Sequence, residues 1–157
     1  MTQPSLAAAP LTAMADTDRL IAELDHALAS VTDAREIRAR TVATLALARA
    51  EGMAAIEAGF ARHPRAARET VRAIAMLTDA LVTGVHHVAT TRLHPQQSAS
   101  ETQRLAVLAV GGYGRAEMAP ASDVDLLFLT PWKITGWAES VVESMLYMLW
   151  DLKLKIG

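Results

Sequence analysis

Two aspartates separated by a single residue, Asp123 and Asp125, are the side chains best suited to chemistry. They precede an apolar run at residues 126–129, which is typical of a short strand. Because side chains alternate faces along a strand, both carboxylates are predicted to project together while Val124 points into the core. Adjacent carboxylates repel each other unless a cation lies between them, and hard oxygen ligands suit Mg²⁺. Asp123 and Asp125 are therefore predicted metal ligands and catalytic residues.

A glycine-rich turn precedes the aspartates. Gly111, Gly112 and Gly114 follow an apolar run at residues 105–110, which we interpret as a buried strand. Glycine allows a tight turn and a close approach to a ligand, and backbone N–H groups at a helix start favour phosphate. Gly111 and Gly112 are therefore the candidate phosphate cradle. A tight turn without a ligand is the alternative.

Three side chains around this turn are weaker candidates for contacting a nucleotide. The planar guanidinium group of Arg115 suits phosphate oxygens, but it could equally pair with Glu117. Tyr113 and Ser122 are turn residues placed near the expected nucleotide. Ser122 and Asp123 could also act only as a cap before the strand, an interpretation that leaves Asp125 unexplained.

The string at residues 111–127, GGYGRAEMAPASDVDLL, resembles two nested families. A glycine pair followed by D-x-D is similar to the signature of the nucleotidyltransferase superfamily. The fuller string is similar to the bacterial PII-protein uridylyltransferase, a bifunctional family of nitrogen signalling that adds and removes uridylyl groups. The positions that match it are Gly111, Gly112, Tyr113, Gly114, Arg115, Glu117, Pro120, Ser122, Asp123, Asp125 and Leu126.

The resemblance implies a fold, a reaction and partners. The fold would be α+β, with an N-terminal helical segment followed by the start of a polymerase-β-like α/β nucleotidyltransferase domain. The reaction would transfer UMP from UTP to the PII signalling protein in the cytoplasm, with Mg²⁺ as cofactor. Asp123 and Asp125 would hold the metal. The nucleotide-binding residues would be Gly111, Gly112, Arg115 and Ser122.

The family also has parts that this sequence lacks. Its members continue with a third carboxylate on a later strand, an HD hydrolase domain that removes uridylyl groups, and ACT domains that bind glutamine. No strand-like segment is expected after residue 129. We therefore interpret the chain as a truncated N-terminal piece that transfers little or no UMP by itself.

Two other interpretations stay open. An enzyme similar to glutamine synthetase adenylyltransferase would share the G…E…SDxDL pattern, although that family's loop usually carries a K-L-G element where this chain has GGYGR. A non-catalytic nucleotide-binding or helical interaction fragment is favoured by the missing third carboxylate and opposed by the intact D-x-D. Nucleoside triphosphate binding with and without Mg²⁺ would separate the enzymes from the interaction fragment.

Composition excludes several classes of protein. The 157 residues carry a formal net charge of −2, which gives no indication of nucleic-acid or anionic-membrane binding. There are no cysteines, so a disulfide framework and thiolate metal sites are excluded, and a reducing cytosol is favoured. No apolar run has the length needed to cross a bilayer.

The rest of the chain must position this site. Residues 1–15 are predicted to be a disordered tail, because they carry prolines and no basic residue. Apolar residues at helical spacing then predict an N-terminal helical region over 16–91. The polar stretch at 92–103 is interpreted as a linker, and 104–157 as a partial nucleotidyltransferase domain. Within that domain an amphipathic helix is predicted over 136–155, with Gly157 as the turn leaving it.

Overall fold

Two helices of the helical region begin directly after aspartates that cap them. In the computed structural model, which describes residues 16–96 and 104–157, α2 (Thr17–Ala27) starts after Asp16, whose carboxylate accepts the N–H groups of Asp18 and Arg19. Likewise α3 (Ala34–Arg62) starts after Asp33, which accepts the N–H of Glu36. The predicted tail at 1–15 and most of the predicted linker at 92–103 lie outside the described residues.

The last helix of this region changes character near its end. It is α-helical as α4 (Ala67–Val88) and continues as the π-helix η1 (Ala89–Leu93).

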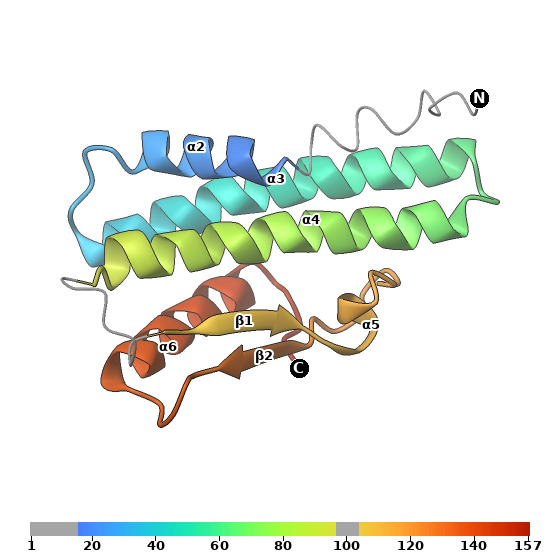
Figure 1. Ribbon diagram of the computed structural model, residues 1–157. Coiled ribbons are helices and arrows are strands. Elements are labelled where there is room, and N and C mark those ends of the chain that lie inside the picture. The colour runs from blue at the N-terminus through green and yellow to red at the C-terminus, as the bar shows by residue number, and fades with distance from the viewer. Residues whose placement is uncertain (1–15, 97–103) are drawn as a thin grey trace, which may run out of the picture.

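The helices pack closely where glycine removes a side chain. A Cβ added to Gly84 would lie 3.1 Å from a methyl group of Leu24 and 3.2 Å from one of Leu45. Figure 1 shows α2, α3 and α4 side by side, with the sheet and α6 below α4 in that view.

The two predicted strands are neighbours in an antiparallel sheet. β1 (Ala106–Ala109) and β2 (Leu126–Leu129) pair so that Ala106 faces Leu129 and Ala109 faces Leu126. The short helix α5 (Gly111–Gly114) follows β1 directly. The chain therefore enters the glycine turn at the end of the sheet where β2 begins.

One face of the sheet is covered and the other is open. Val107 and Phe128, which are register partners, pack against the core. Their neighbours Leu108, Leu127 and Leu129 are between 39% and 45% exposed. The expectation that residues 105–110 form a fully buried strand is therefore wrong for one face. The reason is that helices cover the inner face alone, among the residues that the structure describes.

The chain after β2 departs from prediction near its end. Helix α6 (Gly136–Asp151) stops before residue 155, and Lys153 adopts a left-handed conformation with φ +60°. The backbone then runs parallel to the start of β2. Val124 N–H donates to the Lys155 carbonyl at 2.7 Å, and Gly157 N–H donates to the Val124 carbonyl at 3.2 Å. This pairing corrects two predictions. A strand-like segment does follow residue 129, and Gly157 is part of it and not the turn that leaves the helix.

The result is an α+β arrangement that is mostly helical, with a small sheet. One continuous hydrophobic core joins the helical region to the sheet and α6, through residues such as Leu81, Val124 and Met145. The division into a helical region and a partial nucleotidyltransferase domain stays a prediction. Among the described residues, none of the helices combines the length and hydrophobicity that a membrane span requires.

Candidate functional site

Antiparallel pairing brings the glycine turn beside the aspartates. The ladder extends past the strands, since Val110 N–H donates to the Asp125 carbonyl at 3.1 Å. Gly111 therefore lies immediately beside the residue pair formed by Val110 and Asp125. The two halves of the sequence motif, separated along the chain, meet at one end of the sheet.

The contact between Gly111 and Asp125 requires glycine for two reasons. Gly111 has φ +59°, a left-handed conformation that disfavours residues with a Cβ. A Cβ built at this position would also overlap a carboxylate oxygen of Asp125. The close approach that the sequence assigned to a ligand is therefore already used by the protein's own carboxylate.

Asp123 and Asp125 lie just before β2, on the opposite side of the chain from the buried Val124. Val124 between them is 1% exposed, as the alternation of faces predicts. Gly157 packs against this side, because a Cβ on Gly157 would lie 2.6 Å from Asp125 Oδ1 and 3.9 Å from the Cβ of Asp123. The backbone of Gly157 thus lies against the carboxylate of Asp125 and near the Cβ of Asp123.

The two carboxylates suit a metal ion that takes its remaining ligands from water and substrate. Within residues 16–96 and 104–157, no cluster of three or more His, Cys, Asp or Glu side chains is grouped to hold a metal. The carboxylates of Asp123 and Asp125 are oxygen ligands. Mg²⁺ is typically held by one or two carboxylates, with waters and substrate phosphates completing its shell. The residues present therefore fit Mg²⁺ bound together with a triphosphate, and their role as ligands stays a prediction.

Among the described residues, the side-chain contacts of Arg115 and Ser122 are with groups other than the aspartates. Arg115 Nε lies 3.4 Å from Glu117 Oε2, and both side chains are largely exposed, so the pairing considered from sequence is the one observed. Ser122 lines a cavity of about 160 Å³ together with Val124 and residues of α4. That cavity lies on the covered side of the strand. The nucleotide-binding roles of these two residues stay predictions without a supporting contact.

Tyr113 has a larger structural role than its place in a turn suggested. Its side chain is 5% exposed, and its hydroxyl donates to Asp79 Oδ1 on α4 at 2.7 Å. Burial, and then the hydrogen bond to Asp79 and its charge, raise the pKa of Tyr113, so the hydroxyl keeps its proton. An aromatic residue between glycines in a turn is the one sequence signal that could have indicated an anchor.

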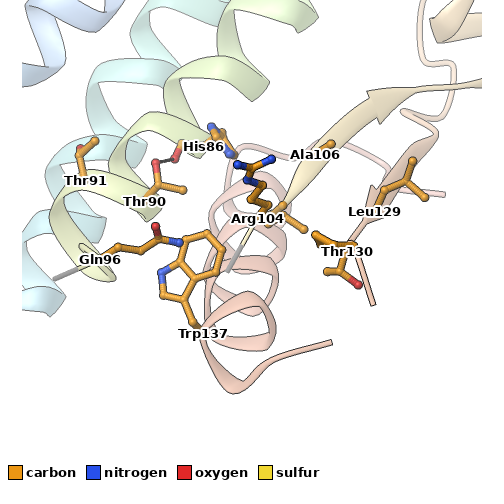
Figure 2. Close-up of a pocket in the computed structure, with 11 residues that line it drawn as sticks. His86, Thr90, Thr91, Gln96, Arg104, Ala106, Leu129, Thr130 and Trp137 are labelled. Atoms are coloured by element: carbon orange, nitrogen blue, oxygen red, sulfur yellow. Dashed lines mark hydrogen bonds between the residues drawn. The ribbon is translucent and has the colours of Figure 1, made fainter. Parts of the chain in front are cut away.

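A larger cavity lies at the opposite end of the sheet. Its volume is about 710 Å³, and it is lined by Ala106 and Leu129, the register pair farthest from the aspartates. Figure 2 shows His86 and Trp137 among its walls. Burial, and then the neighbouring His87, lower the pKa of His86. Its volume suits a small ligand, but its position separates it from the D-x-D pair.

Comparison with known proteins gives a family match over most of the chain. The family model described as glutamate-ammonia ligase adenylyltransferase matches residues 3–149. No solved structure matches the chain.

The curated relatives carry a different name. Two proteins named bifunctional uridylyltransferase/uridylyl-removing enzyme, from Cereibacter sphaeroides and Ruegeria pomeroyi, are 57% identical over 147 residues and 54% identical over 144 residues. A protein of the same name from Rhodospirillum rubrum is 41% identical over 145 residues. These matches cover 92% to 94% of this chain and 16% of each relative. The chain thus spans a small part of the length of the relatives it matches.

Proposed function

Because this chain belongs to the glutamate-ammonia ligase adenylyltransferase family, we propose that it supplies the metal-binding and phosphate-binding part of a nucleotidyl-transfer site. The observation that carries the proposal is the contact of Gly111 with Asp125, which joins the glycine turn to the D-x-D pair. The family match and the motif indicate the same chemistry. The geometry supports it, because the two halves of the motif meet at one end of the sheet.

The proposed reaction moves UMP from UTP to an acceptor and releases pyrophosphate. Asp123 and Asp125 would hold Mg²⁺, which when bound would neutralise negative charge on the triphosphate. The glycine turn, with Gly111 and Gly112, would let backbone N–H groups approach the phosphates without steric hindrance. Gly157 lets the backbone approach Asp125, because a Cβ there would lie 2.6 Å from Asp125 Oδ1.

The choice of UTP rests on the relatives. Proteins 57% and 54% identical to this chain are named uridylyltransferase/uridylyl-removing enzymes. The loop GGYGR also lacks the K-L-G element of the adenylyltransferases. Adenylyl transfer from ATP to glutamine synthetase is the second candidate, because the matching family model bears that description.

The acceptor and the wider context are also part of the proposal. The acceptor would be the PII signalling protein, in the cytoplasm. Glutamine sensing through ACT domains and removal of uridylyl groups through an HD domain would belong to parts of such a protein outside this sequence. Residues 1–157 alone would transfer little UMP.

A transfer assay with the full-length protein tests the reaction. UTP or ATP labelled at the α-phosphate is supplied with PII or glutamine synthetase, with and without Mg²⁺. We expect label on PII from UTP, only when Mg²⁺ is present. Label on glutamine synthetase from ATP would select the second candidate, and no transfer with any pair would contradict the proposal.

A further inference from the structure

The glycine turn is attached to the helical layer by one side chain. Within α5 (Gly111–Gly114) the other positions are glycine, so Tyr113 supplies the side chain of this segment. Its buried ring ends in a hydroxyl that donates to Asp79 Oδ1 at 2.7 Å. Asp79 lies on α4, 34 positions earlier in the chain. This hydrogen bond links the helical region to the candidate transfer site.

The turn needs such an anchor, because its backbone has little to hold it in place. Glycine loses more conformational entropy on ordering than any other residue, and a single helical turn is not stable by itself. Local backbone bonds contribute, with Gly114 N–H donating to the Val110 carbonyl at 2.8 Å and Glu117 N–H to the Gly112 carbonyl at 3.0 Å. These bonds fix the internal shape of the turn. They do not tie it to the helical layer.

Asp79 and Tyr113 line a cavity beside the sheet. A cavity of about 220 Å³ lies between α4 and the inner face of the sheet, lined by Asp79, Tyr113, Val107 and Leu126 among others. The ring of Tyr113 therefore passes from the glycine turn across this space to α4. Leu126, which lines this cavity, directly follows Asp125, the residue whose carboxylate touches Gly111.

We propose that Asp79 is a positioning residue of the transfer site, which holds the glycine turn against Asp125 by accepting the hydrogen bond of Tyr113. This inference rests on the proposed function. It makes α4 a support of the glycine turn, although no residue of α4 belongs to the sequence motif.

The test compares variants of the full-length protein in two measurements. Tyr113→Phe and Asp79→Ala each remove the bond, whereas Asp79→Asn keeps an acceptor oxygen at the same place. Tyr147→Phe is the matched control, because Tyr147 lies on α6 with its side chain 54% exposed. The measurements are kcat and KM for UTP in transfer to PII, and hydrogen exchange of the amides at residues 110–117.

The expected results follow from loss of one hydrogen bond. Tyr113→Phe and Asp79→Ala should each raise the KM for UTP about tenfold, with a smaller change in kcat, and speed exchange at 110–117. The double variant should be no worse than either single variant, because both remove the same bond. Asp79→Asn and Tyr147→Phe should stay close to wild type in both measurements.

Contrary results separate this inference from the proposed function. A wild-type protein that transfers nothing would overturn the proposed function, and the role of Asp79 with it. An active wild type whose KM is unchanged in Tyr113→Phe and Asp79→Ala would overturn this inference alone. The inference would also fall if Asp79→Asn were as defective as Asp79→Ala, because an intact acceptor would then not suffice.

Discussion

The backbone of Gly111 lies against the carboxylate of Asp125, at the point where the end of β1 meets the start of β2. The two residues belong to different halves of the motif and are joined by the antiparallel register of the sheet. This contact makes the glycine a structural requirement of the aspartate's position as well as a candidate phosphate contact. Its consequences can be tested separately from those of the carboxylates.

Substitution of Gly111 by alanine should impair both stability and transfer. The left-handed φ of +59° costs a residue with a Cβ about 1–2 kcal/mol, and the added methyl group would displace Asp125. We expect a lower Tm and a loss of transfer of about a hundredfold or more, since a displaced metal ligand misplaces the reacting groups. Gly59→Ala is the matched control. A Cβ on Gly59 would meet nothing within 4 Å in the last turn of α3, so Gly59→Ala should not lower the stability. Normal transfer by Gly111→Ala would contradict the contact.

Loss of either carboxylate charge should abolish transfer and spare the rest of the protein. In the full-length protein, Asp123→Asn and Asp125→Asn should each eliminate labelling of PII from UTP, because one ligand charge fewer weakens metal and triphosphate binding. Uridylyl removal, which we assign to a domain outside this sequence, should continue. Asp18→Asn is the control, because Asp18 is exposed in the first turn of α2. Near-normal transfer by both site variants would refute the role of the D-x-D pair.

Residues 1–157 expressed alone should associate through the open face of the sheet. Leu127 and Leu129 are 44% and 45% exposed beside Leu108, and together they form an apolar strip on a short sheet. Light scattering after size exclusion should report oligomers that Leu127→Lys reduces. Leu47→Lys, at a position 62% exposed on α3, should leave association unchanged. A monomer at high concentration would argue against this. The same material should transfer little or no UMP to PII.

Acidification should destabilise the fold through His86. Burial first, and then His87, lower its pKa below the ordinary value of 6.5. A histidine whose pKa is depressed by folding stabilises the protein fully above the unfolded pKa, and this stability is lost as the pH falls through the folded pKa. The free energy of unfolding should therefore decrease as the pH falls below 6.5. His94 contributes in the same direction, because burial and Arg38 lower its pKa.

The variant His86→Gln should flatten this dependence in denaturant titrations repeated across the pH range. Because His94 remains, the slope should be reduced rather than abolished, and the double variant with His94→Gln should reduce it further. A wild-type stability that is constant below pH 6.5, or a His86→Gln profile parallel to wild type, would contradict the assignment.

The sequence by itself determined the features that depend on neighbours within a few positions. Apolar residues at helical spacing predicted the helical region over 16–91, and α2, α3 and α4 lie within it. The buried Val124 between the two aspartates follows from the alternation of side chains along an extended chain. The sequence also predicted a strand before the glycine turn and a second strand after the D-x-D pair.

Local patterning failed at the end of the chain for an identifiable reason. Leu152 and Ile156 have the spacing of one helical face, whereas Leu154 and Ile156 also have the alternation of a strand. Both periods fit so short a segment. The left-handed Lys153 and the partner strand at Val124 decide between them, and the pairing partner lies about thirty residues away in the chain.

Tertiary structure alone decided how the site is assembled. The antiparallel register sets Val110 opposite Asp125, and so places Gly111 against the carboxylate. The packing of α4 against the sheet gives the hydroxyl of Tyr113 its acceptor on Asp79, while Arg115 pairs with Glu117. Folding alone brings these residues together. A hydrogen bond or steric contact requires interatomic distances of a few ångströms, and no pattern along the chain encodes such a distance.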